Sequence, residues 1–238
     1  SRLENKNKKL DDLVTDKDNL MGILFHDIRS PMAALKTVAD FVEDDNENLN
    51  ESTMELLKEL QKVSAQGLSL VDNIWAIYEL ENKDLSTVKS PVNVHDVFDE
   101  LMQEFEGKSA LTNIKFEVYS ITTVINIHQY LLTSVIRNLL SNAFKFSPSG
   151  TTVKLNASET KDNVLITIKD QGQGFSKEDQ QNIFKKFQKL SANPLHNEKS
   201  SGLGLYLVKL ICNKINATIE LKSEQNKGAE FTITLSKN

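Results

Sequence analysis

The sequence HQYLLTSVIRNLLSNAFKF, residues 128–146, predicts a helix, and two segments with the character of strands follow it. These segments are TVKLNAS at residues 152–158 and VLITIK at residues 164–169. In the second segment apolar side chains alternate around Ile166, and the segment is long enough to lie centrally in a sheet. A helix followed by strands of this kind is typical of an α/β domain.

Further elements on both sides extend this pattern to an α/β sandwich with a mixed sheet. They are a helix at residues 95–106, strands at 115–119 and 123–125, a helix at 203–215, and strands at 218–223 and 230–235. Between residues 175 and 201 the sequence is polar and irregular, which is typical of a functional lid or a mobile loop.

The first 82 residues differ from this domain, because their apolar residues recur at helical spacing and glycine and proline are rare. A heptad pattern of leucines predicts a coiled-coil signalling helix over residues 1–24. We expect a helical hairpin over residues 16–82, with the acidic, asparagine-rich segment 43–50 as its turn. Residues 83–91 then form a linker to a second domain at residues 92–238.

The predicted hairpin has more apolar surface than it can bury by itself. Its second helix, expected at residues 52–81, carries on one face Leu57, Leu60, Ser64, Val71, Ile74 and Tyr78. Two amphipathic helices cannot bury both of their seams, and dimerisation into a four-helix bundle is the physical remedy. The leucine pattern alone is equally consistent with a structural coiled coil.

Length, net charge, cysteine count and the length of apolar runs exclude several classes of protein. The 238 residues suffice for one large or two small domains, and the net charge of −5 argues against a surface that coats nucleic acid. Cys212 is the single cysteine, which excludes an internal disulfide and a structural zinc site. No apolar run approaches the roughly 20 residues that span a bilayer. We expect a cytoplasmic piece without membrane contact of its own, preceded in the full protein by a sensor domain or membrane segment.

The segment FHDIRSPM, residues 25–32, lies within the first predicted helix. On the heptad pattern His26 faces outward, where its ring nitrogens can act as nucleophile or base near neutral pH. Asp27 follows directly and can orient the imidazole or accept its proton. Ser30 lies one turn later on the same face, and Pro31 predicts a kink. A surface histidine beside a tolerated kink is the plainer alternative, and a metal site is disfavoured because Ser30 occupies the position of a second ligand.

Asn138, Asn142 and Lys145 recur at positions i, i+4 and i+7 of the helix predicted at residues 128–146, so they share one face. The amide oxygen of Asn142 is a hard ligand suited to Mg²⁺, and Lys145 can neutralise phosphate charge. This face is therefore a candidate phosphate and metal site, and a solvated polar face is the alternative.

The segment DQGQGF, residues 170–175, ends the strand predicted at residues 164–169. The carboxylate of Asp170 can accept a hydrogen bond from an exocyclic amine such as that of adenine. Gly172 and Gly174 permit close backbone approach to a ligand and positive φ angles. The third glycine of the dinucleotide fingerprint is absent, so the segment does not complete that motif. No GxxxxGK[ST] segment occurs in the sequence, which excludes a P-loop enzyme.

The segment SSGLGL, residues 200–205, opens the helix predicted at residues 203–215. Small residues before a helix leave backbone N–H groups available to hold an anion, and the helix dipole favours negative charge there. An ordinary glycine-rich entry into a helix is the alternative.

Taken together, in this order and spacing, the four segments resemble the sensor histidine kinases of two-component signalling, over residues 16–235. FHDIRSPM resembles the phosphoacceptor box, and residues 138–145, 170–174 and 201–205 resemble the N, G1 and G2 boxes. The segment FKKF at residues 184–187 resembles the F box of the ATP lid, and GAEF at 228–231 is similar to the closing strand signature.

The resemblance implies roles for individual residues. His26 would be phosphorylated with help from Asp27, Ser30 occupies the position linked to phosphatase activity, and Asn142 would bind Mg²⁺. The nucleotide-binding residues would be Asn138, Asn142, Lys145, Phe146, Asp170, Gly172, Gly174, Phe187, Lys189, Ser201, Gly202, Leu203, Gly204 and Leu205. Lys189 stands where the family often has an arginine, and a lysine cannot make the bidentate contact of an arginine.

The function implied is autophosphorylation of His26 from ATP and Mg²⁺, within a homodimer. The phosphoryl group would pass to an aspartate of a response regulator receiver domain, which the same protein can also dephosphorylate. Two alternatives remain open. A non-kinase ATPase of the same superfamily accounts for the last three segments but not for His26 and Asp27, and a degenerate kinase would dock a regulator without turnover.

Overall fold

The computed structural model describes residues 25, 28–40, 42, 51–82, 89–185, 188, 195 and 202–237. The chain divides into two compact units, Ser1–Trp75 and Ala76–Asn238. The coiled coil predicted over residues 1–24 and the turn predicted at 43–50 lie outside the described residues. Within the described part, none of the helices has the length and apolar character needed to cross a bilayer.

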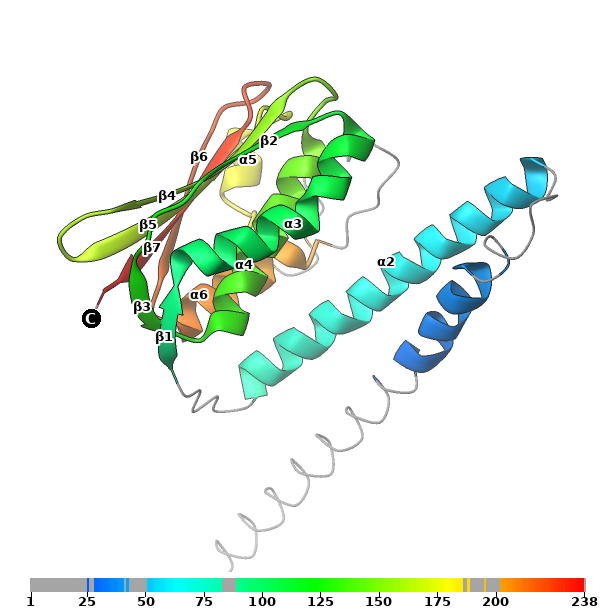
Figure 1. The fold of residues 1–238 in the computed structure, drawn as a ribbon, viewed down its shortest axis with the longest axis horizontal. Helices are drawn as coiled ribbons and strands as arrows, with labels where there is room; N and C mark the ends of the chain where they lie inside the picture. The colour runs from blue at the N-terminus through cyan, green and yellow to red at the C-terminus, as the bar shows by residue number, and fades with distance from the viewer. Residues whose placement is uncertain are drawn as a thin grey trace, which may run out of the picture. The chain divides into compact units, whose positions relative to one another are not determined.

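The first unit contains a helix over residues 28–40 and most of α2, which runs from Glu51 to Asn82 (Figure 1). The helix predicted at residues 52–81 is therefore confirmed to within one residue at each end. Residues 28–40 are helical, including Pro31.

Contacts between these two helices fix their direction. The partners are Phe25 with Trp75, Arg29 with Asp72, Met32 with Gly67, and Asp40 with Gln61. Because residue numbers fall along α2 as they rise along the first helix, the helices are antiparallel, as the predicted hairpin requires. They approach closely, since a Cβ on Gly67 would lie only 2.1 Å from Cε of Met32.

The two helices of the hairpin have one buried and one exposed apolar face. Ala39, Ser64 and Val71 are buried, and the last two belong to the face predicted for α2. A second stripe is exposed, with Leu56, Val63 and Leu70 on α2 and Ile28, Leu35 and Val38 on the first helix. The α2 residues of this stripe are seven apart, as in a coiled-coil seam.

The second unit is built on a five-stranded mixed sheet with the strand order β2-β4-β5-β7-β6. Strand β2 pairs in parallel with β4, and the other neighbours are antiparallel. The bounds are Lys115–Tyr119 for β2, Thr152–Glu159 for β4, Asn163–Lys169 for β5, Thr218–Ser223 for β6 and Ala229–Ser236 for β7. The expected mixed sheet with a central strand around Ile166 is confirmed.

Three helices cover one face of this sheet (Figure 1). They are α3 at Val94–Thr112, α4 at Gln129–Phe146 and α6 at Gly204–Lys214. Register across the sheet aligns Ala157, Ile166, Ile233 and Ile219, all of which are buried. Alternation along each strand thus places one row of side chains in the core and the next row outside it.

The structure corrects the end of the predicted linker. Strand β1, Ser90–Asn93, pairs with β3, Val124–Ile127, so the last two residues assigned to the linker lie in a strand. Pro91 is compatible with this position because the two strands form an isolated ribbon, where a proline needs no partner on its other side.

Two helices also differ from the sequence prediction. Helix α3 continues six residues beyond the predicted end at residue 106, and it stops where Asn113 adopts a left-handed conformation with φ of 52°. A short helix, α5 at Lys177–Gln180, lies in the segment predicted to be irregular, and the side chain of Ser176 caps it by accepting a hydrogen bond from the Asp179 N–H.

Candidate functional site

Asp170 follows the end of β5 and is buried, with 8% of its surface exposed. Its Oδ1 accepts hydrogen bonds from the Gly172 N–H over 2.8 Å and from the Ala229 N–H over 3.2 Å. Burial raises the pKa of the carboxyl from 3.8 to about 6, although the two backbone N–H groups oppose this rise. Oδ2 takes part in neither bond, which suits this group to accept a hydrogen bond from a ligand.

The glycines after Asp170 are required by neighbouring backbone. A Cβ on Gly172 would lie 2.5 Å from the carbonyl oxygen of Phe146, and a Cβ on Gly174 would lie 2.2 Å from that of Glu224. Gly174 also has a φ of 62°, which side chains rarely tolerate. These approaches hold the turn against the end of α4 at Gly172 and against the connection between β6 and β7 at Gly174. The predicted close approach to a ligand stays a prediction.

Helix α4 presents the predicted polar face beside its buried one. Leu139, Leu140, Ala143 and Phe144 are buried in the core, whereas Asn138 and Asn142 are half-buried. Lys145 is 9% exposed, so its aliphatic stem is covered by protein. A helix with both features can support a binding site with one face while the other anchors it to the sheet.

The N-terminus of α6 lies against this polar face. A Cβ on Gly204 would lie 3.3 Å from Oδ1 of Asn138, whose Nδ2 donates to the carbonyl of Ser134 over 2.9 Å. The N-cap residue is Leu203, which makes no side-chain cap, and the chain enters the helix through Gly202 with φ of 71°. A helix N-terminus without a side-chain cap is a suitable place for an anion.

The structure thus brings five of the predicted nucleotide residues into two groups along α4. Asp170 and Gly172 adjoin Phe146 at one end of the helix, and Gly204 adjoins Asn138 eight residues earlier, about 12 Å along the axis. Asn142 lies between them in the sequence. Near the first group, Leu195 from the predicted lid donates its N–H to the Lys145 carbonyl over 2.9 Å.

Two further predicted residues, Ser30 and Leu205, lie on helices. Ser30 is exposed on the helix of the first unit, and Leu205 is half-buried in the first turn of α6. The remaining predicted site residues lie outside the described part of the chain, and their roles stay predictions. They are His26, Asp27, Phe187, Lys189 and Ser201.

The Asp170 turn is supported by residues at the ends of β6 and β7 that the sequence did not predict as site residues. Ser223 accepts a hydrogen bond from the Phe175 N–H over 2.9 Å and donates to the Gly228 carbonyl over 2.7 Å. A Cβ on Gly228 would lie 2.1 Å from the carbonyl oxygen of Asp170. Gly228 was within the closing strand signature and could have been found, whereas Ser223 has the sequence character of an ordinary strand end.

The residues near α4 fit a Mg²⁺ ion only in combination with a ligand that supplies oxygen atoms. Among the described residues no group of three His, Cys, Asp or Glu side chains could hold a metal. Asn142 offers one hard amide oxygen, and Mg²⁺ in proteins commonly takes one or two protein ligands together with substrate phosphates.

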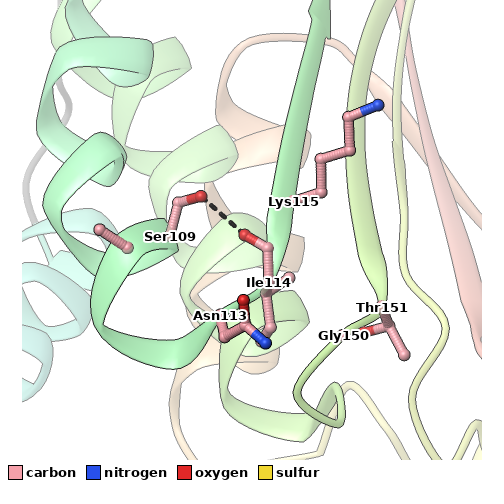
Figure 2. Close-up of a pocket in the computed structure, with 7 residues that line it drawn as sticks. Ser109, Asn113, Ile114, Lys115, Gly150 and Thr151 are labelled. Atoms are coloured by element: carbon pink, nitrogen blue, oxygen red, sulfur yellow. Dashed lines mark hydrogen bonds between the residues drawn. The ribbon is translucent and has the colours of Figure 1, made fainter.

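A separate pocket of about 350 Å³ lies between the end of α3 and the loop after α4 (Figure 2). Its lining comprises Ser109, Ala110, Asn113, Ile114, Lys115, Gly150 and Thr151, none of which is a predicted site residue. Its polar groups already bond within the protein, since Ser109 donates to the Ile114 carbonyl over 2.6 Å and the Gly150 N–H to the Asn113 carbonyl over 2.7 Å.

Comparison with known proteins relates both units to one class. Residues 128–238 match the family of histidine kinase-, DNA gyrase B- and HSP90-like ATPases. The chain is 28% identical over 222 residues to the sensor protein KdpD of Clostridium acetobutylicum, an alignment that covers 93% of this chain and 25% of KdpD. It is 28% identical over 230 residues to the histidine protein kinase SaeS of Staphylococcus epidermidis, covering 93% of this chain and 64% of SaeS.

A solved structure shares the fold of this chain. The crystal structure of full-length ShkA in complex with AMPPNP superimposes with a TM-score of 0.71 at 20% sequence identity, over 91% of this chain and 45% of ShkA. The chain therefore spans from a quarter to about two thirds of the length of these proteins. Residues 128–238 thus match the histidine kinase-, DNA gyrase B- and HSP90-like ATPases, and the chain is similar to sensor histidine kinases over nearly its whole length.

Proposed function

We propose that this chain is the kinase core of a sensor histidine kinase, which transfers the γ-phosphoryl group of ATP to His26. The observation that carries the proposal is the buried Asp170 carboxylate, held by a glycine turn against the end of α4 within an ATPase domain. The antiparallel hairpin that contains the segment FHDIRSPM supplies the second element that a histidine kinase needs.

Nucleotide binding in this proposal uses both groups along α4. Asp170 accepts a hydrogen bond from the exocyclic amine of adenine, as its buried carboxylate and uninvolved Oδ2 favour. Asn138, Lys145 and the N-terminus of α6 contact the phosphates, and Asn142 is the protein ligand of Mg²⁺. The ion supplies neutralisation of phosphate charge. Residues proposed to complete the site are Phe146, Gly172, Gly174, Phe187, Lys189, Ser201, Gly202, Leu203, Gly204 and Leu205.

The proposed reaction is a single phosphoryl transfer. Nε2 of His26 forms a bond to the γ-phosphorus, and the bond from that phosphorus to the oxygen bridging the β- and γ-phosphates breaks, so that ADP leaves. The Nδ1 proton of the phosphorylated imidazole passes to Asp27 or to water. Positioning and charge neutralisation supply most of the catalysis in such transfers.

The partners in this proposal are a second copy of the chain and a response regulator. The exposed stripe of Leu56, Val63 and Leu70 supports a dimer, because pairing two hairpins in a four-helix bundle covers such a stripe. The phosphoryl group then passes from His26 to an aspartate of the regulator, and Ser30 assists its later hydrolysis. The core is placed in the cytoplasm, as part of a longer receptor.

The decisive experiment measures transfer of label from γ-labelled ATP to the protein in the presence of Mg²⁺. Wild type is compared with His26→Gln and Asn142→Ala. Matched controls are His95→Gln and Asn126→Ala, which alter an exposed histidine of α3 and an exposed asparagine of β3. We expect acid-labile, base-stable label on wild type and both controls, and none on the two site variants.

Two other outcomes would replace the proposal. Phosphate release that persists in His26→Gln, with no labelling of any variant, would identify a non-kinase ATPase of the same family. An absence of both nucleotide binding and labelling in wild type would identify a module that docks a regulator without turnover.

A further inference from the structure

Arg29 and Asp72 join the two helices of the hairpin. Nε and Nη2 of Arg29 both donate to Oδ1 of Asp72, over 2.9 Å and 2.5 Å. Two nitrogens of a planar guanidinium that share one oxygen restrict how far Arg29 can swing, and therefore how far its helix can rotate about its own axis. The contact is a restraint on orientation as well as an ion pair.

Among the described residues of this unit, the other ion pairs each lie within a single helix. They are Lys36–Asp40 and Lys62–Glu59. Such pairs stabilise a helix slightly but leave its rotation against a neighbour unrestrained. Arg29–Asp72 therefore has a geometric role that the other two lack.

This role is not mainly one of stability. The side chains of Arg29 and Asp72 are 44% and 56% exposed, and ion pairs exposed to this degree contribute little to folding. The hairpin has stronger sources of stability, such as the edge-on contact between Phe25 and Trp75 at 5.3 Å between ring centroids. Loss of the ion pair should therefore leave the hairpin folded.

The position of the ion pair in the sequence, close to His26, suggests a function for this restraint. His26 lies one residue after Phe25 and three residues before Arg29. Both flanking residues contact α2, at Trp75 and Asp72, so the described contacts with α2 bracket the phosphoacceptor in the sequence. A rotation of the helix would change the direction in which a side chain between these contacts points.

We propose that the Arg29–Asp72 ion pair is a positioning device that sets the rotation of the phosphoacceptor helix and thereby the rate at which His26 is phosphorylated. The proposal rests on the kinase function proposed above. An attacking atom must lie about 3–3.5 Å from its target and be aligned with it, so a small rotation lowers the rate sharply without affecting how ATP is bound elsewhere.

The test measures the rate of His26 labelling as a function of ATP concentration in the full 238-residue chain. We expect Arg29→Ala and Asp72→Ala each to lower the maximal rate about two- to fivefold, while the ATP concentration at half-maximal rate stays within about twofold. Arg29→Lys keeps the charge but loses the two-nitrogen contact, so its rate should be intermediate. The charge swap Arg29→Asp with Asp72→Arg should recover most of the maximal rate.

Lys36→Ala and Glu59→Ala are matched controls, because each removes an ion pair within a single helix of the same hairpin. Circular dichroism melting shows whether each variant remains folded. The proposal is overturned if Arg29→Ala and Asp72→Ala label as fast as the controls, or if the charge swap is as slow as the worse single variant. Failure of wild type to be labelled at all would instead contradict the kinase function.

Discussion

The two units of this molecule bury their apolar residues to very different degrees. In the α/β unit the largest core side chains, such as Phe98, Leu132 and Phe144, are fully buried. In the helical unit Leu56 is 69% exposed and Val38 is 58% exposed. The α/β unit therefore completes its own core, whereas the helical unit presents an apolar stripe that only another surface can cover.

This difference assigns separate tasks to the two units. A domain that closes its own core can hold a rigid turn such as that of Asp170 without help from a partner. A hairpin with an uncovered stripe gains stability only on association, so its packing can respond to what covers it. We expect mutations in the two units to differ in kind, one set acting on folding at any protein concentration and the other acting through assembly.

The largest effect is expected from Phe144→Ala in the α/β unit. The ring of Phe144 stacks on Phe105 and meets Phe116 edge-on, each with centroids 5.5 Å apart. Removing it from a fully buried site should cost about 3–5 kcal/mol of unfolding free energy. Urea unfolding measures this loss, and Leu111→Ala, which changes an 89% exposed side chain of α3, should stay within about 0.5 kcal/mol. Equal losses in both variants would contradict a closed core.

The next effect tests the helical unit through Val63→Glu with Leu70→Glu. Charges in the exposed stripe should weaken self-association at least about 100-fold, since each leucine or valine buried in a dimer contributes roughly 1.5–3 kcal/mol. Analytical ultracentrifugation measures the dissociation constant. The control double variant, Ala65→Glu with Ser69→Glu, adds the same charge at exposed positions on another side of α2.

We expect the control to dimerise like wild type and the α/β unit to unfold normally in both. The proposed difference between the two units would be contradicted if wild type were monomeric at all concentrations. It would also be contradicted if the stripe variant dimerised with the dissociation constant of wild type.

How far these features follow from the sequence depends on how local their causes are. The bounds of β2 and β6 matched the prediction fully, because alternation of apolar residues is set by neighbours in the chain. The strand at Ser90–Asn93 was missed, because its only pairing is with β3, more than 30 residues away, and it contains a proline. A short strand without such a partner resembles a linker.

In the candidate site, too, residues with local sequence signals could be predicted and residues that depend on distant contacts could not. Asp170, Gly172 and Gly204 could be named as candidates because small and acidic residues at element ends form recognisable motifs. Ser223 was missed, because its bonds to Phe175 and Gly228 depend on how β6 and β7 meet the Asp170 turn. Likewise the exposed stripe of the hairpin was expected only as a general surplus of apolar surface, since which face is covered depends on the register of the two helices.

Asp170→Asn in the α/β unit is expected to have a smaller effect on the free energy of unfolding than Phe144→Ala, and to raise it rather than lower it. The pKa of Asp170 is raised to about 6 by burial, so the stability it contributes is fully present below pH 3.8 and is lost as pH rises through about 6. The rise from 3.8 corresponds to about 3 kcal/mol. Asparagine cannot ionise, so the variant should be about 1–3 kcal/mol more stable than wild type at pH 8 and similar to it at pH 4.

Urea unfolding at the two pH values measures this gain, and Asp162→Asn, on an exposed turn, is the matched control. The same variant should lose affinity for a non-hydrolysable ATP analogue, because an amide presents an N–H as well as an oxygen toward the exocyclic amine. A variant less stable than wild type at pH 8 would mean that the carboxylate is held by more than the two backbone N–H groups.

The smallest effect concerns nucleotide affinity in wild type as a function of pH. Because the ionised carboxylate of Asp170 is a stronger hydrogen-bond acceptor than the protonated carboxyl, affinity should be constant above about pH 7 and should decrease as pH falls below about 6. Bound adenine favours the carboxylate, so binding should release a proton near pH 6, which calorimetry in buffers of different ionisation enthalpy detects. Asp170→Asn should show neither the decline nor the proton release. If wild type binds the analogue equally well at pH 5 and pH 8, the carboxylate does not contact the ligand, and the closed α/β unit holds its nucleotide by the residues along α4 alone.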